Sequence, residues 1–415
     1  MSKKIILVLV ACAAYGLGKA QISYDTVITN PTYANNVWYS LENDDQGSFA
    51  ANAWDLSLST AMTASNELTT AVWFNHKIGK VYEIPGSDPL DFTNADTTGL
   101  STWTPLYNSD VTWSKGAFNS TTNLGQFDYG WGDYNMTTHG IDANRVFVIA
   151  YTNGDFKKLT ISSTNTANTY TLVFDNLNNT DLTTEQIDVT PYTSKNFVGY
   201  NLTTKAIVDR EPAAADWDLY FHQYPSFDYD PPYTVTGIFQ NAGVQVAKVY
   251  PVNDPETFVD FSNVTWSDSI ATIGYNWKSF DGMAFVIADS TVYFVTDKAG
   301  NVWKLIMTGF GGSSTGKYMF GKEKLSGAGL EEENALFAMA YPNPASDQTT
   351  IVLNNAPEAQ LSVYSMNGTS VYTTNLNASS LITTVLETSN WANGVYQILV
   401  TSGNTLSNLK LVVQH

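Results

Sequence analysis

Two short aromatic stretches have residue types that could take part in binding. Residues 127–134 read FDYGWGDY and residues 227–233 read FDYDPPY, so each stretch combines aromatic rings with aspartates and turn residues. Exposed rings of this kind could stack on a sugar ring or a porphyrin, whereas buried rings would pack the loop itself. Loop packing is the more common outcome, and both alternatives stay open for each stretch.

Neighbouring aspartates suggest a second chemistry, because carboxylate oxygens bind calcium. Asp228 with Asp230, and Asp44 with Asp45, are such pairs, but neither stands in the spacing of an EF-hand loop. Solvated acidic turns are the commoner interpretation of pairs like these.

Signatures of known enzyme classes are absent. The sequence contains no His-Glu-x-x-His, no Gly-x-Ser-x-Gly and no phosphate-binding glycine loop. We therefore expect a protein without enzymatic activity. A carboxylate pair for glycoside hydrolysis leaves no local signature, so a carbohydrate-active enzyme remains as the third alternative.

The amino terminus predicts export. Lys3 and Lys4 precede an apolar run at residues 5–14, and Gly18 and Ala20 are small residues at the positions that a signal peptidase inspects. We expect cleavage after Ala20. The run is too short to span a membrane, and no later run is long enough to be a transmembrane segment.

A lipoprotein signal is the alternative, because residues 9–12 (LVAC) place a cysteine where lipidation would occur. Cys12 would then become the first residue. With the ordinary cleavage, the mature chain has no cysteine, and hence no disulfide, thiolate metal site or cysteine nucleophile.

Composition favours a globular β-protein. Hydrophobic residues make up 43% of the chain and aromatic residues 13%, while charged residues reach only 14%. Removal of Lys3, Lys4 and Lys19 moves the formal charge from −19 to −22. Such an acidic surface disfavours nucleic acid and anionic membranes as partners.

The chain contains an internal repeat. NVWYSL at 36–41 is followed by AWDLSL at 53–58, and FVGYNL at 197–202 is followed by DWDLYF at 216–221. The tryptophans of the two Trp-Asp pairs stand 163 residues apart, and further segments match in the same order. We expect both tryptophans to anchor cores, and the aspartates, Asp55 and Asp218, to point outward or cap a turn.

Local patterns predict strands and turns throughout. Residues 145–159 have the pattern of a hairpin around Asn153 and Gly154, and a short helix is expected near residues 175–186. The expected organisation is a signal peptide at 1–20, β-domains at 21–185 and 186–321, a linker at 322–336, and a last domain at 337–415.

The last domain carries a specific set of motifs. These are YPNP at 341–344, a turn at Asn367 and Gly368, NGVY at 393–396 and KLVV at 410–413. Seven short strands in this stretch predict a small immunoglobulin-like β-sandwich. Any immunoglobulin-like end domain could share the turns and the alternation, but not the whole set of motifs.

The stretch resembles the C-terminal sorting domain of cargo of the type IX secretion system, found in Bacteroidota. The family's basic residue near Ser407 and Asn408 is missing here. The resemblance implies that the type IX machinery is a partner and that the tail is removed from a secreted or outer-surface protein. The residues that carry the sorting motif are Pro342, Asn343, Pro344, Gly368, Gly394, Tyr396 and Lys410.

The repeats resemble the HmuY-like family of secreted β-proteins, whose best-known members bind haem. The match rests on YNLTT at 200–204, DWDLYFH at 216–222 and GVQVA at 243–247. It covers about 190–325, and more weakly 23–177, where Ser59 or Thr60 stands in place of His222. The resemblance implies haem as a cofactor and haem, or a haem-carrying protein, as a partner. Haem iron needs histidine or methionine ligands in an apolar pocket. The candidates are His76 with His139 or Met136 in the first repeat, and His222 with Met283 in the second.

The expected fold is therefore all-β, with two tandem HmuY-like domains and a C-terminal immunoglobulin-like β-sandwich. The expected function is that of a secreted or cell-surface protein that binds haem or another apolar, ring-shaped ligand. The alternative is a non-enzymatic adhesion or carbohydrate-binding module that keeps the fold without haem.

Overall fold

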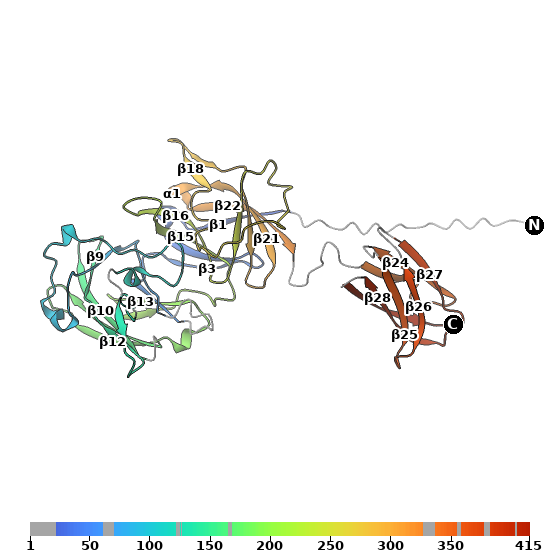
Figure 1. Cartoon of the computed structure of the whole chain (residues 1–415). Coiled ribbons are helices and arrows are strands. Elements are labelled where there is room, and N and C mark those ends of the chain that lie inside the picture. The colour runs from blue at the N-terminus through green and yellow to red at the C-terminus, as the bar shows by residue number, and fades with distance from the viewer. Residues whose placement is uncertain are drawn as a thin grey trace, which may run out of the picture. The chain divides into compact units, whose positions relative to one another are not determined.

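The computed structural model describes residues 22–60, 70–121, 125, 127–164, 168–326, 337–354, 358–376, 382–402 and 405–415. The chain divides into two compact units, Met1–Ala328 and Gly329–His415 (Figure 1). Both are built from strands, which confirms the all-β class. The predicted signal peptide at 1–20, with Cys12, lies outside the described residues.

Two large antiparallel sheets in the larger unit have the same strand order. One sheet is β1 (Ser23–Ile28), β22 (Lys317–Ser326), β21 (Val302–Phe310), β20 (Val292–Thr296) and β17 (Val246–Val249). Its counterpart is β12 (Thr183–Asp188), β11 (Thr169–Asn176), β10 (Phe156–Thr164), β9 (Phe147–Tyr151) and β6 (Gly79–Glu83). The helix expected near 175–186 was wrong, because this segment contributes to β11 and β12.

Two four-stranded sheets repeat the same correspondence. The first is β16 (Tyr233–Gln240), β15 (Leu219–Ser226), β2 (Asn35–Ser40) and β3 (Asp44–Ala50). Its counterpart is β5 (Val72–Phe74), β4 (Leu56–Ser59), β13 (Phe197–Asn201) and β14 (Ala206–Val208).

The remaining elements are short. They are β7 (Gly132–Tyr134), β8 (Ile141–Ala143), β18 (Lys278–Phe280), β19 (Phe285–Ile287), helix α1 (Gly312–Thr315) and the 3-10 turns η1 (Pro31–Tyr33), η2 (Pro89–Asn94), η3 (Leu100–Thr102), η4 (Ala117–Asn119) and η5 (Thr190–Tyr192).

The two repeats exchange strands. In Figure 1, β1 lies beside β22, and their partners Ser23 and Lys322 are 299 residues apart in sequence. In the opposite direction, β12 and β13 from the start of the second repeat pair with β11 and β4 of the first repeat. One half of the unit is therefore continuous, β4–β14, and the other is split, β1–β3 with β15–β22. We call them the continuous half and the split half.

Two predicted boundaries fall inside strands of this arrangement. The boundary at 185/186 lies within β12, which pairs along its length with β11. Residues 322–326, assigned to the linker, belong to β22, where Lys322 and Glu323 are buried. Residues 327–336 lie outside the described residues.

The aspartates of the two Trp-Asp pairs play equivalent parts in the two halves. Asp55 Oδ2 accepts a hydrogen bond from the Leu202 N–H at 2.8 Å, and Asp218 Oδ2 accepts one from the Leu41 N–H at 2.7 Å. Asp218 Oδ1 also accepts from the Lys298 N–H at 2.8 Å. Both side chains are buried, so of the two expected roles the capping of a turn is found and the outward orientation is not. Each aspartate thereby holds the turn of a hairpin from one repeat against the strand of the other repeat with which that hairpin pairs.

Aromatic side chains fill the junction between the halves. Trp38, Trp73, Trp113 and Trp217 are buried in one cluster, and Trp54 is buried nearby, as expected for core anchors. The Trp113 Nε1–H donates to the Gln240 carbonyl of β16 at 2.9 Å. Because this bond joins the continuous half to the split half, the junction is a packed interior.

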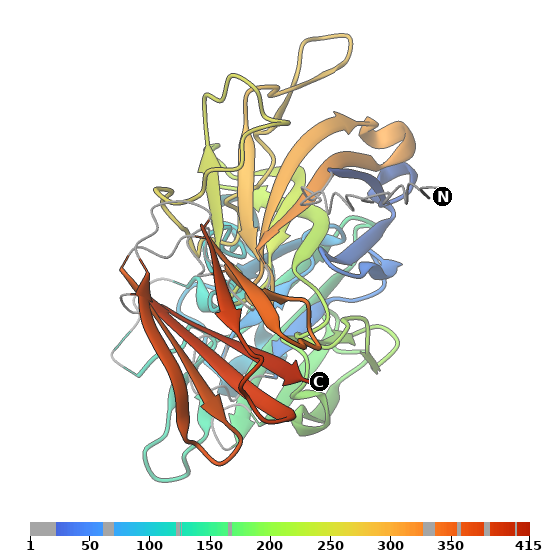
Figure 2. The ribbon, with the colours of Figure 1, turned by 90° about the vertical axis from the view of Figure 1, so that its right-hand side faces the viewer.

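The smaller unit is the predicted two-sheet sandwich. Figure 2 shows its sheets, which contain β23 (Phe337–Tyr341), β24 (Gln348–Asn354) and β27 (Ile382–Glu387) in one, and β26 (Ser370–Leu376), β25 (Ala359–Ser365), β28 (Gly394–Ser402) and β29 (Thr405–Val413) in the other.

Hydrogen bonds explain part of the tail motif. The Asn343 side chain donates to the Lys410 carbonyl at 2.7 Å and accepts from the Val412 N–H at 2.8 Å. The Tyr396 hydroxyl donates to the Ala392 carbonyl at 2.8 Å, and Gly368 has a φ of 81°, which favours glycine. YPNP is thus tied to the last strand.

Replacement of Asp218 by alanine should destabilise the larger unit by about 3 kcal/mol, because one buried and one partly buried backbone N–H group lose their acceptor. Urea denaturation followed by tryptophan fluorescence measures this loss. The matched control is Asp216→Ala, an exposed aspartate two residues away, which should change stability by less than about 0.5 kcal/mol. Equal effects of the two substitutions would contradict the assigned role.

Candidate functional site

An open groove of about 1180 Å³ crosses the junction of the two halves. We call it the aromatic groove. The continuous half contributes the loops around Glu83 and residues 102–111, and the split half contributes the turn between β15 and β16. The residues that give it its chemistry are Glu83, Trp103, Tyr107, Asp110, Phe227, Tyr229 and Asp230.

The rings in this groove are unusually accessible. Phe227 is 53% exposed and Tyr229 is 46% exposed. Phe227 meets Tyr107 edge-on, with ring centroids 6.2 Å apart. Its backbone N–H donates to Asp110 Oδ2 at 3.0 Å, which joins the turn of the split half to the loop of the continuous half. Exposed apolar surface of this kind marks a binding site, so the stretch at 227–233 keeps its binding interpretation.

Two of the three carboxylates that line the groove, Glu83 and Asp110, accept hydrogen bonds from the protein. Glu83 Oε1 accepts from Arg145 Nε at 3.0 Å. Burial raises the pKa of the Glu83 carboxyl, and the Arg145 charge opposes this shift. In the part of the chain that the structure describes, no three histidine, cysteine or acidic side chains gather as a metal site. Neither predicted calcium pair therefore forms the core of such a cluster.

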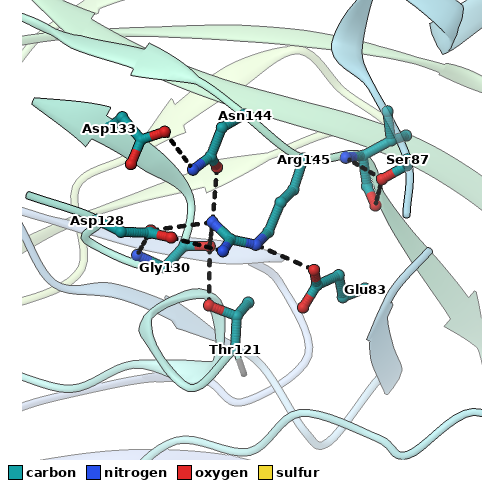
Figure 3. Close-up of polar contacts among 9 residues, drawn as sticks. Glu83, Ser87, Thr121, Asp128, Gly130, Asp133, Asn144 and Arg145 are labelled. Atoms are coloured by element: carbon teal, nitrogen blue, oxygen red, sulfur yellow. Dashed lines mark hydrogen bonds and ion pairs between the residues drawn. The ribbon is translucent and has the colours of Figure 1, made fainter. Parts of the chain in front are cut away.

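Figure 3 shows the polar network around Arg145, which holds Glu83 of the groove lining. Arg145 forms two bonds to the Asp128 carboxylate, at 2.6 and 2.9 Å, and donates to the Gly130 carbonyl at 3.1 Å. Trp131 in the same loop is completely buried, whereas Phe127 is exposed. The stretch at 127–134 therefore serves mainly as packing.

A second, smaller space lies within the junction. It has a volume of about 50 Å³, and we call it the junction cavity. His76, which follows β5, and His222, on β15, both line it. Sequence reasoning paired His76 with His139 or Met136, and His222 with Met283. The structure instead brings together one histidine from each half, a pairing that only the strand exchange creates.

Both cavity histidines are tightly packed. The His222 ring stacks on Tyr220, with centroids 4.2 Å apart, and meets Phe239 at 4.4 Å. Burial, and then the Arg210 charge, lower the pKa of His222 to about 3. His76 Nε2 accepts from the Asn108 N–H at 3.2 Å, and burial lowers its pKa as well. Both rings are therefore neutral near pH 7.

The other ligand candidates lie elsewhere. Met136 and His139 belong to the turn between β7 and β8, where Met136 is 62% exposed and His139 Nδ1 contacts the Tyr134 hydroxyl at 2.8 Å. Met283 is 93% exposed in the turn between β18 and β19. None of the three lines the groove or the cavity.

Sequence reasoning missed half of the groove. Trp103, Tyr107 and Asp110 line it, but they stand in a stretch without a motif. No local signal identifies them, because they meet the turn of the split half only in the folded chain.

A buried glutamate also lies at the junction. Glu211 Oε1 accepts from the Asn196 N–H at 3.1 Å, and the Asn196 side chain donates to Asn241 Oδ1 at 2.6 Å. Burial raises the pKa of Glu211 to about 7, although Arg210 opposes the shift.

Comparison with known proteins identifies the tail. Residues 339–414 match the family described as the secretion system C-terminal sorting domain, which confirms the resemblance of the tail. The protein is thus exported by the type IX secretion system to the cell surface or the medium. The match leaves residues 22–326 unassigned, so the HmuY-like resemblance stays a prediction.

The remaining comparisons add little. No curated protein sequence matches the chain. The crystal structure of dimeric latent PorU from Porphyromonas gingivalis is similar over 65% of this chain and 31% of that chain, at 11% identity and a TM-score of 0.19. This chain thus spans less than a third of that protein, and nothing is inferred from the likeness. No described helix is long and apolar enough to cross a membrane.

The pH dependence of the free energy of unfolding should reveal the raised pKa of Glu211. Its folded pKa of about 7 exceeds the ordinary 4.5, so its stabilising contribution is complete below about 4.5 and is lost as the pH rises through about 7. Relative to Glu211→Gln, the wild-type protein should lose about 3 kcal/mol of unfolding free energy across this range. Urea denaturation at a series of pH values measures the difference.

The comparison with Glu211→Gln isolates this group, because the buried histidines titrate in both proteins and act in the opposite direction as the pH falls. Parallel stability curves for the two proteins would show that Glu211 is ionised without cost.

Proposed function

We propose that this exported protein is a non-enzymatic adhesion module that binds a carbohydrate chain in the aromatic groove. The observation that carries the proposal is a single groove to which both halves contribute aromatic rings, two of them about half exposed. The sorting domain places the protein outside the cell, where surface polysaccharides are available as ligands.

Aromatic rings and carboxylates together suit a sugar. The C–H face of a sugar ring packs on an aromatic face, while its hydroxyls donate to carboxylates and tyrosine oxygens. Trp103, Tyr107, Phe227 and Tyr229 supply the faces, and Asp110 and Asp230 supply acceptors. The formal charge of −19 favours neutral or basic sugars over acidic ones.

The contacts of the carboxylates support binding without hydrolysis. Glycoside hydrolysis requires one carboxyl that gives a proton and a second that acts as nucleophile or base. Glu83 is held by Arg145, and Asp110 accepts from the Phe227 N–H. Both groups therefore act structurally in this arrangement.

Haem is the ligand that the HmuY-like resemblance implies, and the geometry favours it less. The aromatic groove is large enough for a porphyrin, but its lining holds no histidine or methionine. The junction cavity contains His76 and His222, but about 50 Å³ is far too small for a porphyrin ring. The space and the expected ligands are thus in different places.

Single substitutions of the exposed rings should weaken glycan binding. Phe227→Ala and Tyr229→Ala each remove a stacking face, and we expect about a tenfold loss of affinity for each. Calorimetry with the polysaccharide that binds the wild type best in an array measures the loss. Tyr24→Ala, which removes an equally exposed ring outside the groove, should bind like the wild type. Unchanged affinity in both groove variants would refute the proposed site.

A haemin titration separates the two ligands. We expect no shift of the Soret band with the wild type, and the same spectrum with His222→Ala. A shifted band that disappears in His222→Ala would reinstate haem as the ligand.

A further inference from the structure

The junction cavity is basic in an acidic protein. The chain has 39 acidic residues and 20 lysines and arginines. The cavity lining nevertheless contains two positive side chains, Lys77 and Arg210, beside the neutral His76 and His222, and no aspartate or glutamate. This excess of positive charge favours an anion in the cavity.

Arg210 is the centre of this charge. Its guanidinium donates to the Tyr220 hydroxyl at 3.1 Å and to Ser57 Oγ at 2.9 Å, and lies 4.1 Å from the centre of the Trp54 ring. Among the residues that the structure describes, no carboxylate forms an ion pair with it. The adjacent Glu211 is bonded to the Asn196 N–H instead. Arg210 is partly buried between aromatic rings, and the neighbouring Glu211, whose pKa is raised to about 7 by burial, balances its charge only in part near pH 7.

Three buried nitrogen atoms around this cavity lack a hydrogen-bond partner. They are Trp54 Nε1, Arg210 Nε and His222 Nε2, and each belongs to a residue of the cavity lining. The His222 residue is only 7% exposed. A buried donor without an acceptor costs about 1–3 kcal/mol. Three such atoms around one small space indicate a missing acceptor, because native proteins rarely leave these groups unsatisfied.

We propose that the junction cavity binds a small monovalent anion, either a halide or a short carboxylate such as formate. Trp54 Nε1–H and Arg210 Nε–H would donate to it, and His222 would add a third donor in its Nε2–H tautomer. The volume of about 50 Å³ excludes larger anions. Water could accept the same hydrogen bonds but would leave the Arg210 charge balanced only in part, by Glu211.

The anion links the two halves of the larger unit. Trp54 and Arg210 flank the ends of the continuous half, whereas His222 lies in β15 of the split half. Because the site exists only when the halves are joined, binding stabilises the folded state by mass action. This role is independent of the glycan groove.

Thermal unfolding of the full mature chain in different sodium salts at constant ionic strength tests the proposal. Chloride, bromide and formate should each be compared with gluconate, which is too large for the cavity. We expect the unfolding midpoint to rise by a few degrees as the small anion replaces gluconate. The anion that raises the unfolding midpoint at the lower concentration, a halide or formate, identifies the class of anion that the cavity binds. Identical midpoints in all salts would mean water alone and would overturn the proposal.

Variants locate the effect. Arg210→Gln should abolish the dependence on the small anion, whereas Lys80→Gln, which removes an exposed positive charge outside the cavity, should retain it. If Arg210→Gln does not fold, wild-type crystals grown with bromide test the site directly. An anomalous peak beside Arg210 Nε supports the site, and its absence, with an unchanged midpoint, refutes it.

Discussion

The reciprocal exchange of strands between the two repeats is the constraint on which the larger unit depends. β1–β3 complete sheets whose other strands come from the second repeat, and β12–β14 do the same for the first. The two halves therefore share a packed junction rather than a loose interface. The aromatic groove and the junction cavity both lie at this junction, where side chains from the two halves meet.

The sequence identified the parts but not their pairing. Alternation of apolar and polar residues predicts which face of a strand is buried, but not which strand lies beside it. Here the segments 36–41 and 197–202 have similar patterns, so either could complete either half. Pairing within one repeat and pairing across repeats are equally consistent with the pattern. The predicted histidine pairs and the predicted boundary at 185/186 therefore assumed that each repeat folds by itself.

The tail shows the opposite case, in which local sequence was sufficient. The motif around Asn343 works through contacts to the last strand, so the residues that define the family also define the sandwich. Trp54 and Trp217 were likewise assigned correctly to cores. For Asp55 and Asp218 two roles stayed open, an outward side chain or a turn cap, because a buried aspartate that accepts backbone hydrogen bonds looks the same in sequence as a solvated one. Of the aromatic residues that line the groove, Phe227 and Tyr229 belong to a motif that is recognisable in the sequence, whereas Trp103 and Tyr107 do not.

The pairing of β1 with β22 also sets the order of events during biogenesis. Residues 23–28 emerge from the ribosome almost 300 residues before their partners at 317–322, so the split half stays an open set of strand edges until then. Contacts between such distant residues form slowly. Throughout that interval the continuous half has all of its strands, whereas the split half presents unpaired strand edges. Late closure thus makes the newly made chain dependent on protection from aggregation until its last strand arrives.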